Sequence, residues 1–163
     1  DPFLPLVGAA LETKKIEFKE TLSLNTHTQN KDPEIEKTAL KNIAAFLNTD
    51  GGTLLIGVAD NGEIKGVEND VFTNKDKYLL HFMNLIKDKI DESIFPLIEY
   101  SLVDIDDKLV LIVECDISKQ PVYLKIKNEE EFYIKTNPAA LQLKASSLYN
   151  YLKKREMKFS ISK

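Results

Sequence analysis

The chain has 163 residues with 22 basic and 26 acidic side chains, which gives a formal net charge of −4. Its length suits one domain with a single sizeable core, and its hydrophobic fraction of 43% excludes a disordered or fibrous chain. The longest apolar stretch, residues 3–11, has 9 residues, whereas a membrane helix needs about 20. The single cysteine, Cys115, closes no intramolecular disulfide, so we expect a reducing, cytoplasmic setting and no membrane partner.

The net charge is unevenly distributed along the chain. Residues 1–48 carry −1, residues 49–118 carry −9 and residues 119–163 carry +6. A protein that coats nucleic acid indiscriminately would be basic throughout. Any anionic partner is therefore expected to bind at a restricted surface.

Local patterns predict a strand, a loop and a helix in the first third of the chain. Residues 15–19 alternate as a strand does, with Glu17 and Lys19 on its polar face. Residues 21–31 are polar and aperiodic, which is typical of a loop. Apolar residues then recur at helical spacing over 34–48, after a capping aspartate and a proline suited to the first turn.

The rest of the chain predicts further strands and two more helices. Residues 53–59 form an apolar run typical of a central strand, and an Asn-Gly turn predicts that residues 64–67 return as its partner. Helical spacing predicts a helix over 75–90 and a closing helix over 145–154. Two hairpins are expected between these helices, 97–103 with 108–115 and 122–126 with 132–134.

This order, β-α-β-β-α-β-β-β-β-α, predicts a single α+β domain in which helices pack on a mixed β-sheet. We place the domain at residues 11–157, with an N-terminal arm at 1–10 and a C-terminal tail at 158–163. Because the chain begins with Asp1 rather than methionine, we expect it to be part of a larger multidomain protein.

Four residues near the first helix and the central strand are expected to be structural. Gly51 and Gly52 end the helix and open the strand, and Gly57 permits a close approach across that strand. Asn48 is expected to cap the C-terminus of the helix.

Common catalytic and cofactor motifs are absent from the sequence. No glycine-rich segment ends in Gly-Lys-Ser/Thr, so a P-loop is excluded. His27 and His81 lack the spacing of zinc ligands, and no nucleophile elbow is present.

Three carboxylates, Glu12, Glu17 and Asp60, are candidates for a metal site. Carboxylates gathered around Mg²⁺ or Mn²⁺ suit phosphodiester hydrolysis, because the ion activates water and offsets the charge that develops on phosphorus. Glu12 and Glu17 are five residues apart, so the chain must bend between them to bring both together. On the residues alone, solvated surface acids are the favoured interpretation.

Three motifs resemble the Schlafen AlbA-type (AlbA_2) domain family. Residues 12–19 read E-T-K-K-I-E-F-K, similar to the family's E-S-x-x-x-E-F-K opening. Residues 41–62 contain A-F-L-N-T-D-G-G-T-L-L-I-G-V-A-D-N-G, which resembles A-F-A-N-T-x-G-G-x-L-x-I-G-V-x-D-x-G. Residues 132–136 read F-Y-I-K-T, similar to a later F-Y-v-R-t segment with lysine in place of arginine. The resemblance extends from residue 12 to about residue 155.

The resemblance implies a nucleic-acid-binding or nuclease domain. In animal Schlafens this domain is a divalent-metal-dependent endoribonuclease acting on tRNA and rRNA, whose two glutamates and one aspartate correspond to Glu12, Glu17 and Asp60. On that basis we expect a catalytic Mg²⁺ or Mn²⁺ site at these residues and a preference for RNA over DNA. The lysines expected to contact phosphates are Lys14, Lys15, Lys19 and Lys135.

Two other functions remain open. Bacterial and archaeal members are described as DNA-binding or ATP-binding regulators, so a non-catalytic DNA- or RNA-binding module is the second hypothesis. The third is a protein-interaction or sensor domain whose acidic middle is a docking surface. We also expect a homodimer, because a single lobe of this size offers little contact area to a tRNA. Lys153, Lys154 and Arg155 either complement the dipole of the last helix or extend a basic rim.

Overall fold

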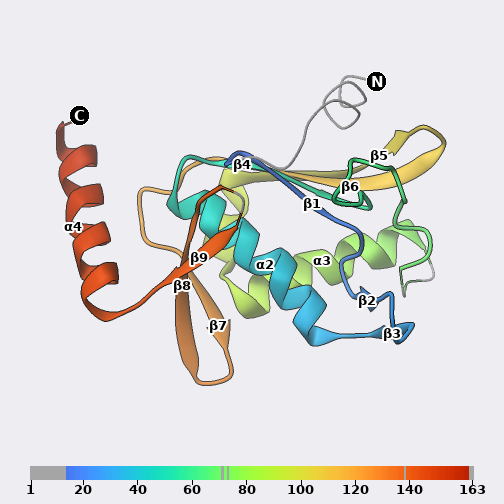
Figure 1. The fold of residues 1–163 in the computed structure, drawn as a ribbon, viewed down its shortest axis with the longest axis horizontal. Helices are drawn as coiled ribbons and strands as arrows, with labels where there is room; N and C mark the ends of the chain where they lie inside the picture. Colours follow the sequence, from blue (N-terminus) through green and yellow to red (C-terminus); the bar gives the residue numbers. More distant parts are fainter. Residues whose placement is uncertain (1–13, 71, 73, 138, 162–163) are drawn as a thin grey trace.

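The computed structural model describes residues 14–70, 72, 74–137 and 139–161, and its main feature is a four-stranded mixed sheet (Figure 1). The strands lie in the order β1-β4-β6-β5, with β1 parallel to β4 and the other neighbours antiparallel. Their bounds are Ile16–Lys19 for β1, Gly52–Ile56 for β4, Lys108–Cys115 for β6 and Ile98–Ile105 for β5. The prediction of an α+β domain with a mixed sheet is confirmed.

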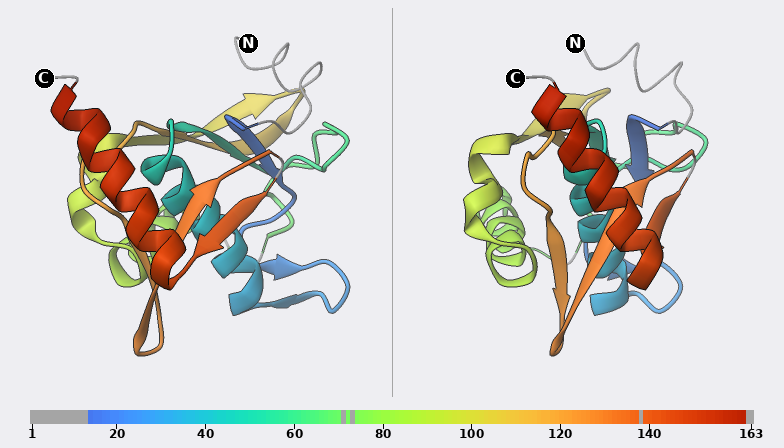
Figure 2. Two further views of the ribbon diagram at one scale, coloured as in Figure 1. Left: turned by 60° about the vertical axis from the view of Figure 1, so that its left-hand side comes forward. Right: turned by 90° about the vertical axis from the view of Figure 1, so that its left-hand side faces the viewer.

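Helix α2 (Pro33–Asn48) contacts both this sheet and a second, three-stranded antiparallel sheet (Figures 1 and 2). The second sheet has the order β7-β8-β9. The remaining elements surround the two sheets and α2. None of the helices in the described part of the chain is long and apolar enough to cross a membrane. The strands of the second sheet are β7 (Tyr123–Ile126), β8 (Glu129–Lys135) and β9 (Ala140–Leu143). The remaining elements are β2 (Leu24–Asn25), β3 (Asn30–Lys31), α3 (Lys75–Lys89), the 3₁₀ helix η1 (Glu92–Leu97) and α4 (Ala145–Ile161).

The start of α2 follows from two residues that the sequence singles out. The Asp32 carboxylate accepts a hydrogen bond of 2.9 Å from the Glu34 N–H, and Pro33 occupies the first turn, where no N–H is needed. Hydrogen bonds from the Asn25 side chain and from the Glu34 backbone hold the pKa of Asp32 below its usual value. The predicted helix over 34–48 is confirmed, as are α3 and the two hairpins β5–β6 and β7–β8.

The predicted partner of the central strand is wrong. Residues 64–67 contribute only one bridge, Val58 with Ile64, and the neighbours of β4 are instead β1 and β6. The chain turns away after β4 because Gly57 has a φ of 106°, which a glycine adopts readily. Strands β2, β3 and β9 were also not predicted, and α4 continues past residue 154 to Ile161, so that the predicted domain end at 157 falls within it.

Both faces of the four-stranded sheet are covered. Leu54 and Ile56 belong to the larger core beneath α2 and α3, whereas Phe18 and Leu55 belong to a smaller core on the opposite face. Because Glu17 and Lys19 are in register with Leu54 and Ile56, they share the helix-covered face. The polar face of β1 is therefore turned toward the interior.

Asn48 ties the C-terminal end of α2 to β8, to α4 and to the residue that precedes β7. Its side-chain amide donates to the carbonyls of Val122 (2.8 Å) and Tyr133 (3.0 Å), and its Oδ1 accepts from the Val122 N–H (2.8 Å). Its own carbonyl accepts hydrogen bonds from Tyr151 and Arg155 of α4. The cap of the helix is thus Thr49 and not, as expected, Asn48, since the Thr49 N–H donates to the Phe46 carbonyl.

Gly51 lies between α2 and β4, and Gly52 is the first residue of β4, as expected. Gly51 has a φ of 73°, and a Cβ there would lie 2.6 Å from the Cys115 carbonyl oxygen. A side chain at this position would combine backbone strain with a collision, so the turn requires glycine.

Replacing Asn48 with alanine should destabilise the fold strongly. The change leaves the backbone groups of Val122 and Tyr133 buried without their partner, and each unsatisfied group costs about 1–3 kcal/mol. We expect a loss of at least about 3 kcal/mol in the free energy of unfolding, measured by urea denaturation. Asn84→Ala, at an exposed position of α3, is the matched control and should change stability little. Equal stabilities of the two variants would contradict the assigned role of Asn48.

Candidate functional site

The structure describes two of the three candidate carboxylates, and it places them in different environments. Glu12 lies outside the described residues. Glu17 lies in β1 and is only 4% exposed, whereas Asp60 lies in an exposed turn beyond β4. The described residues show no contact between Glu17 and Asp60, so the convergence of these two carboxylates on one metal ion stays a prediction.

Glu17 is paired with two lysines, and we call Glu17, Lys19 and Lys135 the Glu17 cluster. Lys19 Nζ lies 3.4 Å from Glu17 Oε1, and Lys135 Nζ lies 3.2 Å from Glu17 Oε2. The Lys135 contact is an ion pair without hydrogen-bond geometry, since Oε2 accepts no hydrogen bond from the described residues. Both oxygens of a nearly buried carboxylate thus face ammonium groups.

Lys135 is buried by its position at the end of β8. Its side chain is 0% exposed, its Nζ donates to the Thr136 carbonyl (3.1 Å), and it lies 5.7 Å from the ring centroid of Phe46. Its backbone N–H donates to Thr49 Oγ1 (2.8 Å), directly after α2. Helix α2 therefore fixes where β8 ends and brings its last lysine to Glu17.

The other predicted phosphate contacts have different surroundings. Lys14 and Lys15 are exposed, and Lys14 forms an exposed ion pair of 3.3 Å with Asp50. Lys19 is partly exposed at 26% of its side chain, whereas Lys135 faces Glu17 in the interior instead of solvent. Of the predicted lysines, Lys14, Lys15 and Lys19 present charge to the outside.

The basic run in α4 separates into two kinds of residue. Arg155 is buried, and its guanidinium donates to the carbonyls of Asn48 and Lys119 (both 3.2 Å) and of Ser118. Lys153 and Lys154 are exposed. Arg155 therefore holds α4 to the body of the domain, and the two lysines form a basic outer surface.

Among residues 14–161, apart from the undescribed positions, no group of three or more His, Cys, Asp or Glu side chains could hold a metal ion. At the Glu17 cluster the described residues supply one carboxylate and two ammonium groups. A complete set of carboxylate ligands would have to include Glu12 and Asp60 as well.

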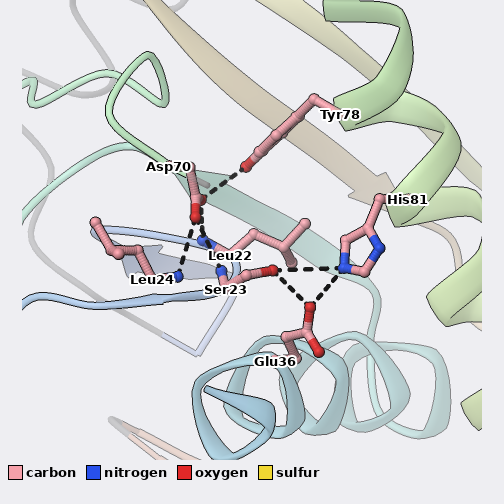
Figure 3. Close-up of polar contacts among 7 residues, drawn as sticks. All are labelled: Leu22, Ser23, Leu24, Glu36, Asp70, Tyr78 and His81. Atoms are coloured by element: carbon pink, nitrogen blue, oxygen red, sulfur yellow. Dashed lines mark hydrogen bonds and ion pairs between the residues drawn. The ribbon is translucent and has the colours of Figure 1, made fainter. Parts of the chain in front are cut away.

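A second polar cluster, which the sequence patterns did not indicate, joins the 22–24 segment to α2 and α3 (Figure 3). The Asp70 carboxylate accepts hydrogen bonds from the N–H groups of Leu22 (2.7 Å), Ser23 (3.3 Å) and Leu24 (3.0 Å). Burial and the nearby Asp70 carboxylate raise the pKa of Tyr78, whose hydroxyl lies 3.5 Å from Asp70. These residues are far apart in sequence, so local periodicity gave no signal for them.

In the same cluster Ser23, Glu36 and His81 meet, but not as a catalytic triad. Ser23 Oγ donates to Glu36 Oε2 (2.5 Å), and His81 Nε2 lies 2.5 Å from the same oxygen (Figure 3). One ring nitrogen faces both partners, whereas a triad uses the two nitrogens separately. Because Ser23 is also fully buried, we interpret these contacts as structural: they hold the 22–24 segment, α2 and α3 together.

Glu17 and Lys135 should be energetically coupled. Removing one partner of a buried ion pair costs about 3–5 kcal/mol, so Glu17→Gln and Lys135→Met should each lower the free energy of unfolding by that order. The double variant should lose less than the sum of the single losses, with a coupling of about 0.5–3 kcal/mol in urea denaturation.

Lys14→Met and Asp50→Asn, made singly and together, form the matched double-mutant cycle for an exposed ion pair. Their side chains are 53% and 38% exposed, so their coupling should be about 1 kcal/mol or less. A Glu17–Lys135 coupling no larger than this would show that the buried pair is energetically unimportant.

Comparison with known proteins gives a family and two similar folds. The Schlafen, AlbA_2 family model matches residues 12–144. The DIP2311 protein from Corynebacterium diphtheriae superposes with a TM-score of 0.62 at 17% identity, covering 87% of this chain and 27% of that protein. This chain therefore spans about a quarter of that relative's length.

The N-terminal domain of a RecG-related protein from Nitrosomonas europaea, related by its description to an ATP-dependent DNA helicase, has a TM-score of 0.55 at 19% identity. The match covers 89% of this chain and 88% of that domain. No curated protein sequence matches. At these identities the structural matches establish the fold, and the family model covers most of the sequence. The chain therefore belongs to the Schlafen AlbA_2 domain family.

Proposed function

We propose that this domain processes nucleic acid, as a divalent-metal-dependent endoribonuclease that acts on structured RNA such as tRNA. The observation that carries the proposal is the Glu17 carboxylate, which is almost buried at the family's glutamate position and is flanked by two lysines. Buried carboxylates with specific charged partners are enriched at functional sites. Membership of the family and the helicase-related description of one structural neighbour support a role with nucleic acid.

Glu12, Glu17 and Asp60 would hold the Mg²⁺ or Mn²⁺ ion. Carboxylate oxygens are the donors that these ions prefer, Asp60 is exposed, and Glu17 Oε2 accepts no hydrogen bond from the described residues. The ion would activate the attacking water and offset the negative charge that develops on the phosphate. Lys19 and Lys135 orient Glu17, and the exposed Lys14 and Lys15 would bind the RNA backbone.

A non-catalytic nucleic-acid-binding module is the second candidate, and one observation favours it. Lys19 and Lys135 already balance the charge of Glu17, so its burial is accounted for without an ion. In that case the exposed lysines of the N-terminal strand and of α4 would supply the binding energy, and binding would weaken as salt rises.

The catalytic proposal predicts that Asp60→Asn abolishes cleavage of tRNA in the presence of Mn²⁺. Loss of even an outer-shell partner of a metal ligand costs about 10- to 100-fold, so loss of a ligand should lower the rate by at least about 100-fold. Glu12→Gln should have the same effect. Cleavage is measured by gel electrophoresis of labelled tRNA.

Glu63→Gln is the matched control, since Glu63 is an exposed carboxylate three residues from Asp60 and should leave the rate unchanged. Unaltered cleavage by Asp60→Asn would refute the assigned site. Metal-independent, salt-sensitive binding of tRNA without any product, retained or strengthened in Asp60→Asn, would establish the non-catalytic module instead.

A further inference from the structure

Strand β5 forms an edge of the four-stranded sheet, and its hydrogen-bonding groups can be assigned from its register. Within the described residues the sheet ends at β5, which pairs on one side with β6. The Asp116 N–H donates to the Leu97 carbonyl (2.8 Å), just outside the pair Ile98–Cys115. Because hydrogen-bonded pairs alternate in an antiparallel ladder, the odd-numbered residues of β5 bond to β6. The backbone groups of Tyr100, Leu102 and Asp104 therefore point away from the sheet.

The turn between the strands supports this assignment. Asp106 and Asp107 have φ values of 55° and 62°, as in a two-residue type I′ turn, and they join Ile105 to Lys108 as a hydrogen-bonded pair. Ile105 is odd-numbered, in agreement with the ladder deduced from the opposite end of the hairpin.

The β5 edge lacks two of the usual protections against strand addition. It is eight residues long and contains neither proline nor lysine, two residues that commonly block an edge strand. Three consecutive outward positions each offer one N–H and one carbonyl. An extended segment could therefore pair with β5 without displacing any strand.

A small cavity lies beside this edge on the helix-covered face. Its volume is about 180 Å³. Phe72, Leu102 and Leu109 line its apolar part, and the polar side chains of Glu68, Asn74 and Lys75 also line it. Leu102 also carries outward-pointing backbone groups, so a side chain of an added strand opposite Leu102 would share its face and point toward the cavity. The cavity is suited to one apolar side chain.

The charge of the hairpin selects the partner. Residues 98–115 carry five exposed carboxylates, Glu99, Asp104, Asp106, Asp107 and Glu114, against the single cation Lys108. Such a surface repels nucleic acid, and pairing with a second copy would bring two sets of carboxylates together. We infer that the β5 edge binds an extended basic segment of a partner protein by strand addition, with one apolar side chain of that segment in the cavity beside Leu102.

The experiment uses a fluorescein-labelled peptide, acetyl-Lys-Val-Lys-Leu-Lys-Val-Lys-amide, and fluorescence anisotropy with the full chain. In antiparallel addition the residues opposite Tyr100, Leu102 and Asp104 are the apolar ones, and their N–H groups point at β5. N-methylation of the Val and Leu residues should therefore weaken binding by about tenfold or more, the equivalent of about 1.4 kcal/mol. N-methylation of alternate Lys residues should leave binding unchanged.

Charge reversal on the protein gives a second readout. Glu99→Lys combined with Asp104→Lys should weaken binding about tenfold or more, since it replaces two negative charges of the edge strand with positive ones that repel the basic peptide. Asp88→Lys combined with Glu63→Lys introduces the same charge at exposed positions outside β5 and should have a much smaller effect. Thermal unfolding of each variant shows that the fold is retained.

Several outcomes would overturn the inference. The inference is wrong if the unmodified peptide does not bind, if the two N-methylated peptides bind with equal affinity, or if the two charge-reversed proteins bind the peptide with equal affinity. A chain that is dimeric in solution and becomes monomeric in Glu99→Lys/Asp104→Lys would assign the edge to a second copy instead. Loss of affinity only on N-methylation of the Lys residues would support strand addition in the parallel direction. None of these results depends on whether the domain cleaves RNA.

Discussion

The position of the Glu17 cluster depends on the last turn of α2. Asn48 binds the backbone of Val122, just before β7, and of Tyr133 in the neighbouring strand β8, and Thr49 Oγ1 accepts a hydrogen bond from the Lys135 N–H. These contacts fix the end of β8 relative to the helix, and the same helix packs against β4, the neighbour of β1. The distance between Glu17 and Lys135 is therefore set by backbone hydrogen bonds at the helix end, and not only by attraction between the two charges.

This arrangement explains how an ion pair can persist in an apolar interior. Desolvation of two charges costs free energy that their attraction repays only when the geometry is well fixed and further polar contacts exist. Lys135 has such contacts in the Thr136 carbonyl and the Phe46 ring, and Lys19 adds a second cation beside Glu17. A carboxylate held in this way is preorganised. Preorganisation serves catalysis, but it serves equally well a binding module that needs a rigid strand, so geometry alone leaves both candidate functions in place.

Local signals predicted the elements well where they act within one segment. The capping aspartate, the proline after it and the glycines that follow α2 all act within a few residues, and the helix bounds agree closely with the structure. The prediction of strand pairing failed for the opposite reason. An Asn-Gly turn favours a hairpin locally, but β4 pairs with β1 and β6, which are distant in sequence. The same limit applies to the site, because the alternation of β1 predicts two faces but not that α2 covers the polar one. The burial of Lys135 is set by tertiary contacts and has no local signature.

The distribution of charge separates the two proposed surfaces in space as well as in sequence. In Figure 1 the turn of the β5–β6 hairpin and the helix α4 lie toward opposite ends of the long axis of the molecule. The hairpin is acidic and α4 carries exposed lysines, so a polyanion and a basic peptide are drawn to different ends. The net charge of −4 is the sum over the whole chain and describes neither of these surfaces. Because the hairpin repels any nucleic acid that approaches β5, the proposed binding of nucleic acid is expected away from the hairpin, at surfaces that carry the exposed Lys14 and Lys15 or Lys153 and Lys154.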